Sequence, residues 1–212
     1  MGCCSGCKDK TPKLSLSRRV LFAFVFGITI SGALFYASRT TDSKQAVLLV
    51  EETVTESIVG KSMPSSEPNR LRIPGLKINT TFVAPLGLLP NGEAAVPDSY
   101  SEVGWYKYSP TPGTLGPAVI FGHVDSYSGP AVFYSLGQLK EGDDIYVERA
   151  DGTTAHFKVE SMERPAQSEF PTARVYGNLN YAGLRLITCT GIYVRGSQRY
   201  THNLIVYARL VE

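Results

Sequence analysis

The chain has 212 residues, 43% of them hydrophobic and 19% charged, which fits one globular domain with additional segments. Its 20 glycines, 13 prolines and 12 tyrosines favour a turn-rich β fold over a helical bundle. The net charge of +2 depends on five basic residues before position 20, and the rest of the chain is slightly acidic, which argues against nucleic-acid binding by the folded part.

The first predicted element is a membrane anchor at residues 20–37, a stretch of 18 residues without charge. As a helix it would span roughly 27 Å, close to the thickness of a bilayer core. The alternative is a cleaved signal peptide, but cutting after Ala37 would leave the bulky Phe35 at the −3 position. The basic residues of 1–19 predict a cytoplasmic N-terminal segment and a single membrane crossing, with the rest of the chain extracellular.

Residues 38–69 are rich in Ser, Thr and Glu, the composition of a linker, and the folded domain is predicted over residues 70–212. The chain has four cysteines: Cys3, Cys4 and Cys7 near its start, and Cys189 far from them. On the predicted topology these two groups lie on opposite sides of the membrane. We therefore expect no disulfide between them.

Short apolar or alternating runs recur through the folded domain, separated by Gly, Pro, Asn and Asp residues. This spacing is typical of an all-β sandwich or a closed barrel. The runs lie at 71–79, 118–124, 144–149, 156–162, 184–189 and 203–211. Only 101–108 and 131–139 have the length of helices, and both are short.

Cys189 follows the apolar run LRLIT and precedes a Gly-containing loop, so it lies at the end of a predicted strand. A lone cysteine on the outside of a cell is exposed to oxidation. Two interpretations stay open at this point: a buried thiol that packs as a small hydrophobe, or a nucleophile. A nucleophile needs a basic or cationic partner, because an unperturbed thiol with a pKa of about 8.5 is only slightly ionised at neutral pH.

The chain has three histidines that are candidates for this partner. His123 follows a buried apolar strand in VIFGHVDS, a position where barrels place working side chains, although a core histidine would fit equally well. His156 and His202 are interpreted as strand surface residues. Asp125 is interpreted as a turn residue, so no triad is predicted.

Several stretches of the domain resemble the sortases, and most closely the class F sortases of Gram-positive actinobacteria. The stretches are GHVDSYSGPAVFYSLGQLKEGD at 122–143, FPTARVYG at 170–177, and LITC at 186–189 followed by NLIVYA at 203–208. LRIPGLKIN and VGWYKYSPTPGTLGPAVIFGHVD also look like that family's opening strand and its approach to the histidine. The resemblance covers nearly all of 70–212, in order and with similar spacing.

The resemblance implies an all-β fold, a closed eight-stranded sortase-type β-barrel with short helices, on the outer face of the cell membrane. It also implies a cysteine transpeptidase in which Cys189 attacks the Thr–Gly carbonyl of an LPXTG-like sorting signal and forms a thioacyl enzyme. A cell-wall precursor amine or a pilin lysine then resolves this intermediate. His123 would exchange protons with the thiol and the leaving amine, Thr188 would flank the site, and we expect no cofactor and no metal.

The resemblance further implies a catalytic arginine, on the strand after the cysteine loop, that stabilises the developing oxyanion. Asn203 stands where several classes carry this arginine, and Thr201 stands where class F sequences commonly have one. Arg199 shares strand parity with both positions and is the predicted residue. Arg195 is the second candidate and Arg185 the third.

Two other functions fit parts of the sequence. A non-catalytic β-barrel binding module displayed at the membrane would keep Cys189 buried and resistant to alkylation. Another cell-wall enzyme, an L,D-transpeptidase, fits less well, because such enzymes carry a Ser–His–Gly–Cys cluster, whereas His123 and Cys189 lie 66 positions apart. A membrane-anchored sortase is therefore the predicted function.

Overall fold

The computed structural model describes residues 60–211 of the chain. The predicted cytoplasmic segment, the anchor at 20–37 and most of the predicted linker lie outside the described residues. Within 60–211, none of the helices has the length and apolar character needed to cross a bilayer.

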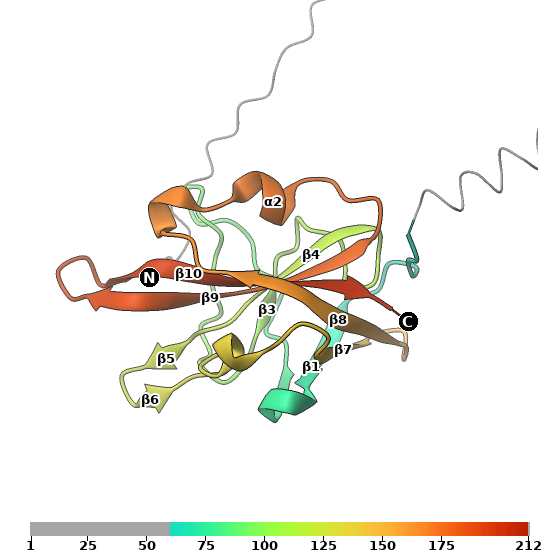
Figure 1. The fold of residues 1–212 in the computed structure, drawn as a ribbon, viewed down its shortest axis with the longest axis horizontal. Coiled ribbons are helices and arrows are strands. Elements are labelled where there is room, and N and C mark those ends of the chain that lie inside the picture. Colours follow the sequence, from blue (N-terminus) through green and yellow to red (C-terminus); the bar gives the residue numbers. More distant parts are fainter. Residues whose placement is uncertain (1–59, 212) are drawn as a thin grey trace, which may run out of the picture. The chain divides into compact units, whose positions relative to one another are not determined.

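The described chain is built mainly from β-strands (Figure 1). The strands are β1 (Pro68–Ile73), β2 (Ile78–Thr81), β3 (Gly104–Trp105), β4 (Gly116–Phe121), β5 (Asp125–Ser126), β6 (Gly129–Pro130), β7 (Asp144–Arg149), β8 (Thr154–Glu163), β9 (Ala182–Val194) and β10 (Arg199–Leu210). The helices are the single 3-10 turns η1 (Pro74–Leu76), η2 (Leu136–Gln138) and η3 (Gln167–Glu169), and the short α-helix α2 (Thr172–Tyr176). Of the two helix-length segments, 131–139 contains only η2, and 101–108 contains β3 instead of a helix.

Eight of these strands form one curled sheet in the order β2-β1-β7-β8-β10-β9-β4-β3. The prediction of eight strands is confirmed, but the prediction of a closed barrel is wrong. The edge strands β2 and β3 have only four and two residues, too few for a continuous ladder between them. Within residues 60–211, the isolated bridges Phe82–Val103 and Leu86–Tyr106 join the chain segments along these edges.

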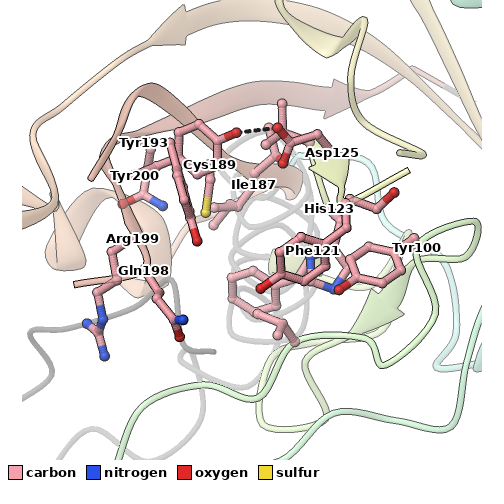
Figure 2. A pocket seen from close by; sticks show the side chains of 17 residues that line it. Tyr100, Phe121, His123, Asp125, Ile187, Cys189, Tyr193, Gln198, Arg199 and Tyr200 are labelled. Atoms are coloured by element: carbon pink, nitrogen blue, oxygen red, sulfur yellow. Dashed lines mark hydrogen bonds between the residues drawn. The ribbon is translucent and has the colours of Figure 1, made fainter. Parts of the chain in front are cut away.

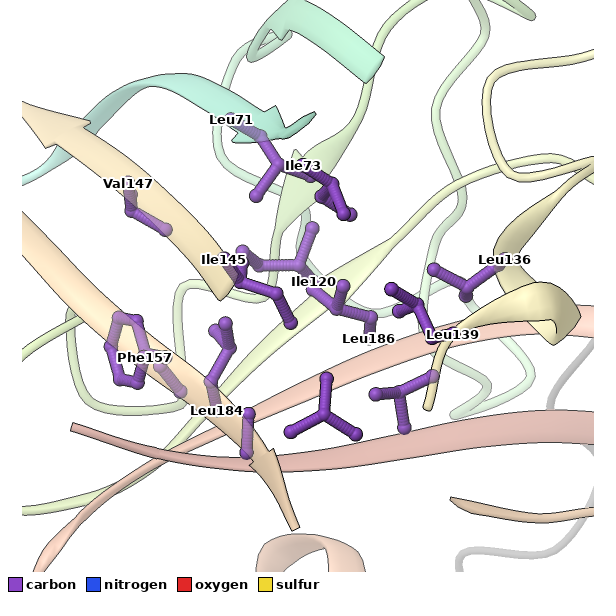
Figure 3. Close-up of a cluster of buried hydrophobic side chains, with 14 of the residues drawn as sticks. Leu71, Ile73, Ile120, Leu136, Leu139, Ile145, Val147, Phe157, Leu184 and Leu186 are labelled. Atoms are coloured by element: carbon purple, nitrogen blue, oxygen red, sulfur yellow. The ribbon is translucent and has the colours of Figure 1, made fainter. Parts of the chain in front are cut away.

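Apolar side chains cover both faces of the central strands. Strand β4 is buried at every position, because successive side chains point to opposite faces and both faces are packed. The larger cluster includes Ile120 and Leu186 on one face (Figure 3). The smaller cluster includes Phe121 and Ile187 on the other face, together with Val175 of α2. The site described below lies beside this smaller cluster.

The segment before β1 packs against the domain, although the sequence predicts a linker up to residue 69. The Gly60 N–H donates a hydrogen bond to Asn180 O at 2.7 Å. The guanidinium of Arg149, a residue that is 2% exposed, donates to Pro64 O. The packed part of the chain therefore begins before the predicted boundary.

Candidate active site

The site lies where β4 ends beside β9. These two strands run parallel, and their last registered pair is Phe121 with Ile187. His123 and Cys189 each follow that pair by two residues, so the register brings them next to each other. Side chains two residues apart share a face of the sheet, which directs both toward the side of Phe121 and Ile187. The strand register thus explains how two residues distant in the sequence meet.

One pocket of about 340 Å³ opens at this position, and all three predicted site residues line it: His123, Cys189 and Arg199 (Figure 2). Phe121 and Ile187 of the smaller core cluster form part of its wall. The pocket therefore combines an apolar wall with a sulfur, an imidazole and a guanidinium, a combination typical of sites that bind and process a ligand.

His123 is held by contacts on its backbone and its ring. Its carbonyl oxygen accepts from the Phe133 N–H at 2.9 Å, and its ring lies 4.7 Å from that of Tyr100. Its Nε2 lies 2.6 Å from Pro97 O. A carbonyl oxygen only accepts hydrogen bonds, so Nε2 carries a proton. Nδ1 is then the nitrogen left to exchange a proton with a reacting group.

Cys189 lies on β9 opposite Asn203 of β10, and the residue is 7% exposed. Nucleophilic chemistry at this position requires the reduced thiol. Next to it, the Thr188 hydroxyl lines the pocket, is buried and has no hydrogen-bond partner among residues 60–211.

Arg199 reaches the pocket from β10 and pairs with a carboxylate. Its Nη2 lies 3.4 Å from Glu93 Oε2, and the two side chains are 36% and 13% exposed. In Figure 2 its guanidinium points away from the Cys189 sulfur. The register between β9 and β10 shifts between Tyr200 and His202, but the extra residue lies on β9, so the alternation along β10 continues from Arg199 to Asn203. Both Arg199 and Asn203 line the pocket.

The other two candidate arginines lie elsewhere. Arg195 is exposed in the turn between β9 and β10 and does not line the pocket. Arg185 is 2% exposed, and its guanidinium lies 4.5 Å from the centre of the Tyr207 ring, within the smaller core cluster. Arg185 therefore contributes to packing rather than to the pocket.

Sequence reasoning missed several residues that line the pocket. They are Val96, Tyr100, Tyr127, Tyr193, Gln198 and Tyr200. It also interpreted Asp125 only as a turn residue, whereas Asp125 lines the pocket and accepts a hydrogen bond from the Tyr200 hydroxyl. The only sequence signal was position, since Asp125 follows His123 by two residues and Tyr200 follows Arg199 directly.

The two remaining histidines lie outside this pocket. His156 Nε2 lies 2.7 Å from Asp144 Oδ1, and its ring stacks on Tyr146 at 4.5 Å. His202 Nδ1 lies 2.7 Å from Thr201 Oγ1. His123 is therefore the histidine that the fold places beside Cys189.

A protein-family model described as "Sortase domain" matches residues 71–211. Sortase A from Corynebacterium diphtheriae is similar in structure, with a TM-score of 0.53 and 20% identity over 82% of this chain and 86% of that chain. Sortase C-1 from Actinomyces oris gives a TM-score of 0.54 and 19% identity over 81% of this chain and 97% of that chain. Sortase C1 from Streptococcus suis gives a TM-score of 0.52 and 17% identity over 83% and 87%. No curated protein matches the sequence.

Proposed function

The chain belongs to the sortase family, and we propose that it is a cysteine transpeptidase that cleaves an LPXTG-like sorting signal between Thr and Gly. The observation that supports this proposal best is the shared pocket of His123, Cys189 and Arg199, at the point where the register of β4 and β9 brings the imidazole and the sulfur together. The apolar wall of the pocket suits the apolar side chains of such a peptide.

In the proposed reaction the Cys189 thiol gives its proton to His123, and the resulting thiolate attacks the carbonyl carbon of the Thr–Gly bond. The tetrahedral intermediate then collapses, the C–N bond breaks, and His123 protonates the departing amine. The product is a thioester on Cys189. An acceptor amine attacks this thioester and gives up a proton to His123. The C–S bond then breaks, His123 returns the proton to the Cys189 sulfur, and the product leaves with a new amide bond.

Arg199 supplies positive charge for the oxyanion in this proposal. Its guanidinium lies 3.4 Å from the Glu93 carboxylate, which is long for an ion pair. The two side chains are partly exposed to solvent. Such a pair is worth little, about 0–1 kcal/mol, so a bound substrate can draw the guanidinium toward Cys189. Thr188 lines the pocket next to Cys189 and would flank the bound peptide.

The finer assignments belong to the same proposal. We infer a class F sortase from the sequence motifs, although Thr190–Gly191 and Thr201 stand where class F sequences commonly have Gly–Gly and an arginine. We also infer a single-pass anchor at 20–37, an extracellular catalytic domain, and a cell-wall precursor amine or a pilin lysine as the acceptor. These inferences rest on the sequence resemblance.

The test is intact-protein mass spectrometry of the full chain, incubated under reducing conditions with an LPXTG peptide. We expect a mass increase that corresponds to the acyl group, and its loss when an amine nucleophile such as triglycine is added. Cys189→Ala removes the nucleophile and is expected to abolish acyl-enzyme formation while the fold is retained. His123→Ala is expected to lower the acylation rate by roughly 10²–10⁴-fold, because it removes the proton carrier.

His156→Ala is the matched control, because it also removes an imidazole, but one that lies outside the pocket. We expect its acylation rate to stay within about twofold of wild type, as befits a histidine remote from the reacting atoms. Turnover that persists in Cys189→Ala would refute the proposed function.

A further inference from the structure

Two hairpins border the pocket, and each has little support from the main sheet at this end. Strands β5 and β6 have two residues each and pair only with each other, as a separate two-stranded sheet. The ladder between β4 and β9 stops at Ile187, and the ladder between β8 and β10 begins at Ile205. The outer part of the β9–β10 hairpin thus extends past the ladders of its neighbouring strands (Figure 1).

A side-chain hydrogen bond joins these hairpins across the pocket. The Tyr200 hydroxyl, on β10, donates to the Asp125 carboxylate, on β5. Figure 2 shows this bond spanning the space between the Cys189 side and the His123 side of the pocket. The Tyr200 ring is supported by the Tyr193 ring at 5.3 Å. The bond therefore connects two chain segments that the main sheet does not pair.

Each end of this bond is close in the chain to a residue of the proposed chemistry. Asp125 follows His123 by two residues, and Tyr200 follows Arg199 directly. Tyr200 also faces the part of β9 that continues from Cys189, because it pairs in register with Tyr193. Movement of one hairpin against the other would therefore change the separation between the imidazole and the sulfur.

We propose that Tyr200 and Asp125 form a latch, a pair of positioning residues that holds the β5–β6 hairpin against the β9–β10 hairpin and so fixes His123 relative to Cys189. This inference rests on the proposed function for its catalytic consequence, but the latch itself is a property of the free protein. Neither residue contributes a reacting atom.

The chemistry of Tyr200 and Asp125 favours a hydrogen bond that persists at neutral pH. Burial, and next the hydrogen bond with Asp125, raise the pKa of Tyr200 to about 12. The hydroxyl therefore keeps its proton at neutral pH and remains a donor to the carboxylate. A phenol that donates to a carboxylate makes a charge-assisted hydrogen bond, which is stronger than one between neutral groups.

The test begins with Tyr200→Phe, which removes the hydroxyl and keeps the ring. We expect the acylation rate constant to fall about tenfold, because misplacement of reacting groups by less than 1 Å is costly, while the fold is retained. Asp125→Ala is expected to cause a similar loss, and Asp125→Asn, which retains an oxygen acceptor, to recover most of the activity. The double variant Tyr200→Phe/Asp125→Ala is expected to lose no more than either single variant.

A second measurement does not depend on activity. Amide hydrogen exchange of the free, reduced protein should become faster in residues 125–130 and 190–200 in both single variants. If wild type forms no acyl enzyme but exchange increases in this way, the proposed function fails and the latch stands. If exchange is unchanged and Tyr200→Phe reacts at the wild-type rate, the latch fails while the proposed function stands.

Tyr207→Phe is the matched control, since Tyr207 also donates its hydroxyl to a carboxylate, that of Glu163, but lies outside the pocket. We expect this variant to be less stable to denaturant and yet to acylate within about twofold of wild type, since its contact is remote from the reacting atoms. A tenfold loss of acylation in Tyr207→Phe would mean that losing any buried tyrosine contact slows the enzyme. That result would overturn the latch.

Discussion

Three arginines are candidates for one catalytic role, and substitution separates them. Arg199→Ala is expected to lower the acylation rate constant by about 10²-fold, the usual cost of removing one oxyanion donor. The free energy of unfolding should change by less than about 1 kcal/mol, because the ion pair with Glu93 is partly exposed. Stopped-flow acylation and urea denaturation measure the two quantities.

Arg195→Ala is the control for loss of a positive charge near the pocket, since Arg195 lies in the exposed turn. We expect it to change the acylation rate by less than about twofold, as for other exposed sites away from the chemistry. Arg185→Ala should instead lower the free energy of unfolding by about 2 kcal/mol, because it removes a buried side chain packed on Tyr207. A large loss of acylation in Arg195→Ala, with Arg199→Ala near wild type, would contradict our choice.

At the residue scale, the sequence predicted the positions that strand ends determine and missed those that depend on contacts between hairpins. Cys189 and His123 could be chosen because each follows an apolar run, with Gly191 two residues after Cys189 and Gly122 directly before His123. Arg199 was chosen by strand parity along β10, and it lines the pocket together with Asn203 of the same strand. Apart from their positions near His123 and Arg199, Tyr200 and Asp125 carry no sequence signal, because their contact depends on how two hairpins meet in space.

The end of β4 is the element that delivers His123, and its geometry depends on Gly122. A Cβ at Gly122 would lie 2.6 Å from Cδ2 of Phe133, a residue that is fully buried in the larger core cluster. Gly122→Ala is therefore expected to lower the free energy of unfolding by about 1–3 kcal/mol, the usual cost of overpacking. It should also slow acylation, because the backbone shift that relieves the overlap displaces His123.

The matched control is Gly75→Ala, because a Cβ at Gly75 meets nothing within 4 Å. We expect its unfolding free energy to stay within about 0.5 kcal/mol of wild type, as for most surface substitutions. Guanidinium denaturation and acylation kinetics test both variants. Wild-type stability and rate in Gly122→Ala would mean that Phe133 yields without moving the strand end, contrary to this prediction.

At the element scale, apolar runs in the sequence predicted the central strands of the sheet well and its edge strands poorly. The runs at 118–124, 144–149 and 184–189 correspond to β4, β7 and the buried half of β9. Burial alternates along β7 and is continuous along β4 and the first half of β9, and this produces the hydrophobic pattern of each run. The segment 101–108 has helical length, but Gly104 and Trp105 pair with β4 instead. Closure could not be predicted, because it depends on the lengths of the edge strands rather than on their composition.

At the scale of the whole molecule, the boundary of the folded domain extends upstream of the predicted start at residue 70. Backbone and side-chain hydrogen bonds attach residues 60–67 to four distant parts of the domain. They include Gly60 N to Asn180 O, Met63 N to Gly113 O, Ser66 N to Thr111 Oγ1, Ala150 N to Glu67 O and Lys61 Nζ to Val211 O. This segment is therefore part of the folded domain.

We expect a chain of residues 70–212 to be less stable to urea than a chain of residues 60–212, by about 3 kcal/mol. Removal of residues 60–69 breaks several hydrogen bonds of about 0.5–1.5 kcal/mol each. It also leaves the Arg149 guanidinium, whose side chain is 0% exposed, without its acceptor at Pro64. Arg149→Met should make the loss of residues 60–69 less costly, because the shorter chain would then not leave a buried guanidinium with only its ion pair to Asp151 at 3.4 Å. Equal unfolding free energies for the two chain lengths would show that residues 60–67 add no stability, and the domain would then begin where the sequence composition changes.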